Sequence, residues 1–224
     1  MTLPSAQKIP VYLEAGQKRT FACAVDWPGW CRSGAGESAA LEALLAYGPR
    51  YSSALGLNTF GFQAPAAVSD FTILTRFKGA SAVDFGVPGI IPPMDEDPLD
   101  GAGLERLQAI LEACWLELER AARLSEGKEL RKGPRGGGRE REEILRHVIE
   151  ANGAYLKAAG WKPVPDGQAG FPIQADREAL AVASRGELPK LGPRGGKHWP
   201  PRYFARRVAW HVLDHAWEIE DRIL

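Results

Sequence analysis

The last stretch of the chain, from Arg202 to Leu224, reads RYFARRVAWHVLDHAWEIEDRIL. Its apolar residues recur every three or four positions, which predicts an amphipathic helix from about Arg202 to Arg222. Two prolines immediately before it suit the start of a helix. The predicted inward stripe is Phe204, Val208, Val212, Ile219 and Ile223, and the predicted solvated face is Arg207, Asp214, Glu218 and Asp221. A helix with one apolar side must pack on other elements, so this stretch predicts a helical C-terminal half.

Two of the four histidines of the chain lie on this predicted helix. His211 and His215 are four positions apart, which places them on one side of the helix at roughly 6 Å of axial rise. His215 falls within the apolar stripe and His211 on its flank. A third histidine, His147, lies on the flank of another amphipathic pattern between about Glu140 and Ala159. We therefore predict that the three histidines bind one divalent ion where the helices meet; three separate interface histidines are the alternative.

The residues around the histidines narrow the class of metal site. Neutral imidazole suits Zn, Ni, Fe and Cu. Three protein ligands leave one position for water or substrate, as in catalytic zinc sites. An HExxH motif is excluded because Val212 follows His211, and the Glu-x-x-His pattern of di-iron proteins is absent. The fourth histidine, His198, lies in a Gly/Pro loop and is not expected to be a ligand.

Outward from these helices, the sequence predicts an α+β fold. Further helices are expected at about Leu104 to Leu124 and Asp176 to Arg185, which completes four helices. The N-terminal part predicts strands at Val11 to Leu13, Phe21 to Val25 and Asp70 to Phe77, and a helix from Glu37 to Leu55 that ends or kinks at Pro49. On the last strand, Phe71, Ile73, Thr75 and Phe77 are expected on one face.

A Pro/Gly-rich stretch separates the two predicted domains. Residues 1–78 are predicted to form a small domain with a sheet and a helix, 79–100 a linker with little regular structure, and 101–224 the helical bundle. A short echo, Gly-Pro-Arg-Gly-Gly, occurs at Gly133 and again at Gly192, each upstream of a histidine-bearing helix. Both are expected to be turns, with anion binding through Arg135, Arg194 and Lys197 as an alternative.

The composition limits the partners. Lys plus Arg equals Asp plus Glu at 28 each, and the absence of a basic excess argues against nucleic acid. No apolar run is long enough to cross a membrane, and Met1 to Pro10 lacks the apolar core of a secretory signal, so we expect a cytoplasmic protein. The three cysteines have no CxxC spacing, which predicts reduced, mostly buried thiols.

The segment Arg206 to His215, RRVAWHVLDH, together with His147, resembles the DinB-like superfamily of DNA-damage-inducible proteins and their relatives. The resemblance covers about Pro98 to Leu224. It implies a four-helix bundle with a long crossover, here Trp161 to Ile173, and a divalent metal on His147, His211 and His215. Zinc or nickel is the implied ion, with iron as an alternative. Some members are metal-dependent transferases or isomerases that use a low-molecular-weight thiol.

The N-terminal region, about Val11 to Phe77, is similar to a HicB-type antitoxin domain. The similarity rests on Phe21 to Gly34 followed by the sequence ESAAL at Glu37. No toxin partner or DNA-binding segment is evident, so an accessory or dimerisation domain is the preferred interpretation, and a homodimer is one alternative for the oligomeric state.

Two functional hypotheses follow. The first is an enzyme, in which the metal activates a small thiol or water toward a small electrophile, as a thiol S-transferase or a hydrolase. The second is a non-catalytic binding or regulatory module with a structural metal. Asp214 and Glu218 are candidates to orient the imidazoles, although solvated surface charges are the preferred interpretation of both.

Overall fold

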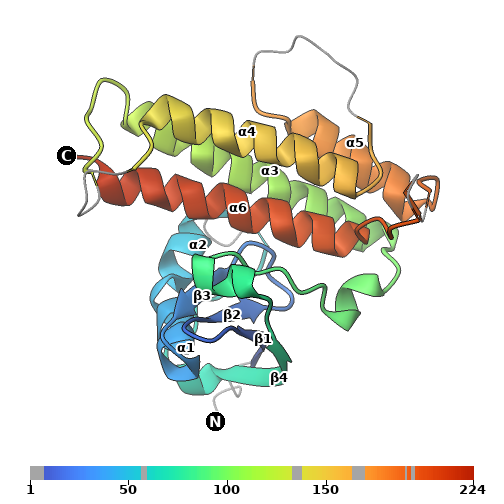
Figure 1. Ribbon diagram of the computed structural model, residues 1–224, viewed down its shortest axis with the longest axis horizontal. Coiled ribbons are helices and arrows are strands. Elements are labelled where there is room, and N and C mark those ends of the chain that lie inside the picture. The colour runs from blue at the N-terminus through green and yellow to red at the C-terminus, as the bar shows by residue number, and fades with distance from the viewer. Residues whose placement is uncertain (1–7, 57–59, 133–137, 163–169, 190, 193–194) are drawn as a thin grey trace, which may run out of the picture. The chain divides into compact units, whose positions relative to one another are not determined.

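The computed structural model describes residues 8–56, 60–132, 138–162, 170–189, 191–192 and 195–224. The chain divides into two compact units, Met1–Ile91 and Pro92–Leu224. The first contains a small sheet with two helices and the second is helical, which confirms the α+β class (Figure 1). The boundary between the units falls inside the Pro/Gly-rich stretch.

The sheet of the first unit has four strands in the order β3-β2-β1-β4. They are β1 (Ile9–Ala15), β2 (Thr20–Ala24), β3 (Cys31–Gly34) and β4 (Phe71–Lys78). β1 is antiparallel to β2 and parallel to β4. β3 was not expected, because its four residues, CRSG, carry no alternation of apolar and polar side chains. β2 is buried along its whole length rather than on one face.

The predicted helix from Glu37 to Leu55 is two helices, α1 (Glu37–Ala46) and α2 (Gly48–Ala54). Pro49 lies in the first turn of α2, where its missing N–H would have no partner in the helix. The Trp30 indole donates to the Leu44 carbonyl of α1 at 2.9 Å. The Tyr51 hydroxyl of α2 donates to the Pro28 carbonyl at 2.7 Å. These buried bonds join both helices to the segment between β2 and β3.

The two halves of β4 present their side chains to opposite faces of the sheet. Val11 pairs with Ile73, but Tyr12 pairs with Thr75, so Leu74 is an extra residue in β4. One extra residue reverses the face of every side chain that follows it. Phe71 accordingly contacts Trp30, whereas Phe77 contacts Tyr12 on the other face. The expectation that four alternate residues of this strand share one face is therefore wrong.

The Pro/Gly-rich stretch is anchored on each side of the boundary between the units. Its first part contains a short 3-10 turn, η2 (Ser81–Phe85), in which Val83 is fully buried. The buried Glu14 carboxylate of β1 accepts a bond from the Gly89 amide at 3.0 Å. Its second part contains η3 (Pro93–Glu96), where the buried Asp95 carboxylate forms a bidentate ion pair with Arg206, with both bonds at 2.8 Å.

The second unit consists of α3 (Gly101–Leu124), α4 (Arg141–Ala158), α5 (Ile173–Ser184) and α6 (Pro201–Arg222), close to the four predicted ranges. α3, α4 and α6 run side by side, with α5 toward one end (Figure 1). The Asp100 carboxylate caps α3 by accepting from the Gly103 amide. Most of the predicted crossover, residues 163–169, lies outside the described residues. Within the described part of the chain, no helix combines the length and apolar character needed to cross a membrane.

A buried carboxylate connects three helices of this unit. Asp176 of α5 is fully buried, and its two oxygens accept from Trp115 Nε1 of α3 and Asn152 Nδ2 of α4, both at 2.8 Å. Burial raises the pKa of Asp176 to about 7, against the opposing effect of the two hydrogen bonds. The side chain therefore changes charge near neutral pH while holding α5 against the helix that carries His147.

The raised pKa of Asp176 predicts that the free energy of unfolding falls between about pH 4 and pH 7. Its folded pKa lies above the unfolded value, so the folded state binds more protons in that window and loses stability as the pH rises. At about 1.4 kcal/mol per pKa unit, the loss is on the order of 4 kcal/mol at most. Urea unfolding of metal-free protein at pH 5 and pH 8 should show this slope in wild type and not in Asp176→Asn. Parallel profiles of the two proteins would contradict the role assigned to Asp176.

Candidate metal centre

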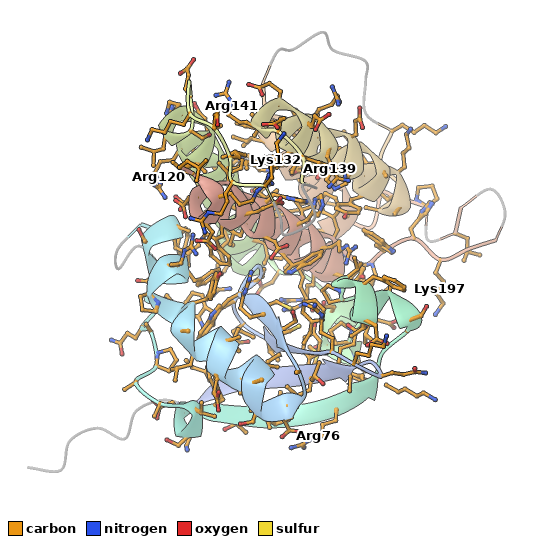
Figure 2. All side chains as sticks on the ribbon, turned by 60° about the vertical axis from the view of Figure 1, so that its left-hand side comes forward. Arg76, Arg120, Lys132, Arg139, Arg141 and Lys197 are labelled. Carbon is orange, nitrogen blue, oxygen red and sulfur yellow. The ribbon has the colours of Figure 1, made fainter. Side chains whose placement is uncertain are left out.

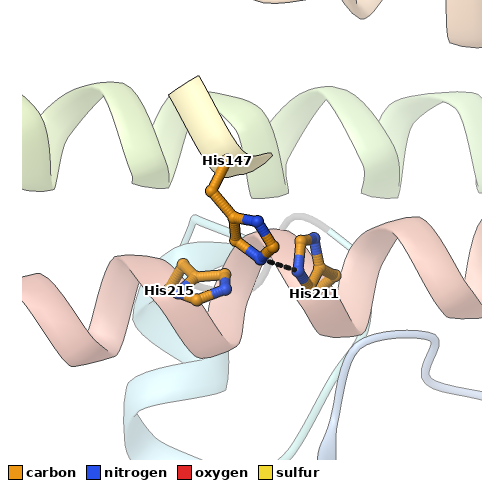
Figure 3. Close-up of side chains that lie close together, drawn as sticks. All are labelled: His147, His211 and His215. Atoms are coloured by element: carbon orange, nitrogen blue, oxygen red, sulfur yellow. Dashed lines mark hydrogen bonds between the residues drawn. The ribbon is translucent and has the colours of Figure 1, made fainter. Parts of the chain in front are cut away.

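The fold brings together the three histidines predicted from the sequence. His211 and His215 project from adjacent turns of α6, with ring centroids 4.7 Å apart. His147 of α4 faces both of them, at a centroid distance of 5.1 Å from each (Figure 3). One possible ligand atom from each ring lies within 4.8 Å of the others, close enough to hold a metal ion. His198 lies elsewhere, with its Nδ1 against the Pro189 carbonyl, as expected of a residue that is not a ligand.

The distance between the ring nitrogens of His211 and His147 fits a tetrahedral ion. His211 Nε2 and His147 Nε2 are 3.3 Å apart. Two nitrogens at roughly 2.0–2.1 Å from one tetrahedral zinc ion would be separated by roughly 3.3–3.4 Å. Among the described residues, the cluster of possible ligands contains no fourth histidine, cysteine or carboxylate. The donor set therefore suits a borderline-soft divalent ion with one coordination position left to a small ligand.

Glu218 orients His215. Its carboxylate lies 2.7 Å from His215 Nδ1, one turn along α6, and its other oxygen accepts from Arg222 at 2.6 Å. An Nδ1–H donated to a carboxylate leaves the lone pair on Nε2, the atom that faces the other histidines. The interpretation of Glu218 as a solvated surface charge is therefore wrong, because its side chain is half-buried and bonded on both oxygens.

The surroundings keep two of the imidazoles neutral. Burial is the main cause that lowers the pKa of His211 to about 2, with further contributions from His215 and His147. Burial, and next the guanidinium of Arg139, lower the pKa of His147. A neutral ring offers its lone pair without first losing a proton, so the two rings are ready to coordinate a cation at neutral pH.

Two guanidinium groups place positive charge near His211. Arg139, labelled in Figure 2, immediately precedes the N-cap of α4. Its carbonyl accepts from the guanidinium of Arg222 near the end of α6. Arg207 of α6 lies one turn before His211, and its guanidinium lies over the Tyr155 and Trp210 rings at 5.3 and 4.8 Å. Both charges lower the pKa of His211. With an ion present, they would favour an anion in the open coordination position.

An aromatic wall borders the site on the side of Arg207. The Tyr155 ring of α4 lies 5.5 Å from His211, edge to face, and 5.5 Å from the Trp199 ring. Trp199 in turn packs edge-on against Tyr203 at 5.0 Å. The histidine cluster thus has a charged border formed by Glu218 and Arg222 and an aromatic border on which Arg207 is stacked.

Several of these neighbours were not predicted from the sequence. Arg207 was placed on the solvated face of its helix, but it is partly buried against the aromatic wall. Arg207 lies four residues before His211, so the helical spacing could have placed it beside that histidine. Nothing in the sequence indicated that Arg139 would lie near the cluster. The first of the two glycine-rich echoes, residues 133–137, and residues 193–194 of the second lie outside the described residues, so anion binding there, the alternative to simple turns, is not tested.

Removing the Glu218 carboxylate should weaken metal binding without abolishing it. Partners of this kind, which orient a metal ligand, contribute about 10–100-fold to affinity. Glu218→Ala is expected to raise the dissociation constant for zinc by that factor in a chelator competition assay. Glu119→Ala is the matched control, because Glu119 pairs with Arg123 one turn away but contacts no histidine. Equal affinities in the two variants would show that Glu218 does not orient His215.

No family model, curated protein or solved structure matches the chain. The three-histidine cluster and its surroundings are therefore the basis for assigning a function.

Proposed function

We propose that this protein is a metal-dependent enzyme that uses a small thiol to attack a small electrophile, with a zinc or nickel ion held by His147, His211 and His215. The observation that carries the proposal is the convergence of three imidazoles, two of them buried, with no fourth protein ligand in the described cluster. A resident structural ion would be expected to have four protein ligands.

The surrounding side chains support an anionic ligand in the open position. A zinc ion held by the three histidines would lower the pKa of a bound water to near neutrality and would hold a bound thiol as the thiolate. Arg139 and Arg207 add positive charge near His211, which favours a thiolate over a neutral thiol. The aromatic wall of Tyr155 and Trp199 offers an apolar surface for the electrophile on one border of the site. Glu218 holds His215 in the tautomer that this arrangement needs.

The same centre supports hydrolysis if water rather than a thiol takes the open position. The two activities differ in what the site binds, so the ligand of the metal decides between them. The DinB-like resemblance of the histidine-bearing helices favours the thiol, and the charges of Arg139 and Arg207 suit either anion.

A thiol titration of the cobalt-substituted protein tests the proposal. Soft sulfur ligands suit this ion class, so cysteine or mercaptoethanol should produce a sulfur-to-cobalt charge-transfer band in the wild-type spectrum. The band should be absent from His215→Ala and retained in His198→Ala, whose missing ring lies outside the cluster. If no thiol changes the spectrum of cobalt-loaded wild type, the transferase is wrong, and a pH-dependent spectrum with a midpoint near neutrality would instead support the hydrolase.

A further inference from the structure

Two cysteines of the first unit lie opposite each other on neighbouring strands of the sheet. Cys23 of β2 pairs directly with Cys31 of β3, and their sulfur atoms are 2.7 Å apart. Both side chains are buried, at 2% and 5% exposure. The third cysteine, Cys114, is buried within α3 of the second unit. The sequence predicted reduced thiols, but it gave no sign that two of them would be opposed.

The backbone at this pair already has the geometry that a disulfide needs. The adjacent pair, Ala24 and Trp30, is joined by a hydrogen bond from the Ala24 amide to the Trp30 carbonyl at 3.0 Å. Hydrogen-bonded and non-hydrogen-bonded pairs alternate along an antiparallel ladder, so Cys23 and Cys31 occupy a non-hydrogen-bonded position. Their α-carbons are then about 4.5 Å apart, inside the range of roughly 4.4–6.8 Å that disulfides span.

We propose that Cys23 and Cys31 form a dithiol that a peroxide oxidises to an intramolecular disulfide. One sulfur, after losing its proton, attacks a peroxide oxygen and breaks the O–O bond, which gives a sulfenic acid and one water. The second sulfur then attacks the sulfenic sulfur, forms the S–S bond and releases a second water. The two thiols together lose two electrons and two protons, and hydrogen peroxide is reduced to two waters.

Access to the pair is controlled by the edge strand β3. Burial, and next the neighbouring Cys23, raise the pKa of the Cys31 thiol well above its ordinary value, so little thiolate is present while β3 is docked. β3 has four residues and is held at the sheet edge by the bond from Arg19 to Ser33 and by the Arg32 guanidinium over the Tyr47 ring. Oxidation is therefore slow in the native protein and faster under conditions that loosen β3.

Peptide mass mapping of the full-length protein tests the proposal. The purified protein is treated with hydrogen peroxide, quenched with acid, alkylated under denaturing conditions and cleaved with trypsin. Both cysteines lie in one expected peptide, Thr20 to Arg32, and Cys114 lies in another, Leu107 to Arg120. After oxidation the first peptide should carry no alkyl group and be lighter by about 2 Da than its reduced, unalkylated form, while the second stays alkylated. Reduction should restore double alkylation.

Matched variants assign the oxidation to this pair. Cys114→Ala should still lose about 2 Da in the Thr20 to Arg32 peptide, whereas Cys23→Ala and Cys31→Ala should not. A wild-type peptide that stays doubly alkylated after peroxide treatment would overturn the proposal. A cross-link between the two peptides, or oxidation of the pair only to sulfinic or sulfonic acids, would also overturn it. The wild-type masses are decisive even where a cysteine variant fails to fold.

Discussion

Replacing His211 by alanine is expected to strip the metal from the purified protein. The His211 ring is buried, its Nε2 faces His147 Nε2 at 3.3 Å, and its centroid lies within 4.7–5.1 Å of the other two rings. Loss of a ligand should exceed the roughly 10–100-fold loss of affinity that follows from removing an orienting partner. Elemental analysis after dialysis against a weak chelator should therefore find wild type near one equivalent and the variant near none.

The fourth histidine supplies the control for this measurement. His198→Ala removes the same side chain from outside the cluster, so it should keep the wild-type metal content. His211→Gln, which preserves more of the buried volume, should lose metal as alanine does and so separates loss of a ligand from loss of packing. Full occupancy in either His211 variant, with the fold retained by circular dichroism, would refute the three-histidine site.

Replacing Arg206 by alanine is expected to lower the free energy of unfolding of the second unit by about 3–5 kcal/mol. Arg206 of α6 and Asp95 of η3 are both buried and joined by two hydrogen bonds of 2.8 Å. Removing the guanidinium leaves a buried carboxylate without its charge partner, which is far more costly than losing an exposed pair. Chemical unfolding followed by tryptophan fluorescence measures the difference.

An exposed pair with the same bonding pattern provides the comparison. Arg76 also forms a bidentate pair, with Glu37, but both side chains are exposed, so Arg76→Ala should change the free energy of unfolding far less than Arg206→Ala does. Asp95→Asn combined with Arg206→Met removes both charges, and should be less destabilising than the sum of the single changes. A loss below about 1 kcal/mol for Arg206→Ala would mean that water or another group replaces the guanidinium.

The helical half of the fold was predictable because its signals are local. Apolar spacing placed α3, α4 and α6 to within a few residues, and it placed the three histidines on inward or flanking positions of two helices. The convergence of the histidines follows from those positions, since two amphipathic helices that bury their stripes bring the flanks of the stripes together. The apolar pattern that predicted α5 was the weakest of the four, and the helix begins at Ile173 rather than near Asp176.

The features that were missed depend on partners distant in the sequence. β3 is too short to show a pattern, and the extra residue Leu74 in β4 is defined only by its pairing with β1. Arg207 and Glu218 were placed on the solvated face of α6, but contacts with Tyr155 and His215 hold them beside the three-histidine cluster. Cys23 and Cys31 lie opposite each other only because of the register of β3 against β2. That register could not be predicted, because the sequence shows no recognisable strand at β3.

The ion pair between Asp95 and Arg206 also bears on how the chain is made. The two residues are 111 positions apart, and Arg206 lies on the last helix. A ribosome adds roughly 5–20 residues per second, so Asp95 is synthesised on the order of 6–20 s before its partner. During that interval α3, α4 and α5 emerge without the helix that covers their apolar faces and supplies two of the three histidines. Folding of this unit is therefore completed only after α6 has been synthesised, and the apolar faces exposed before then are where a ribosome-associated chaperone would act.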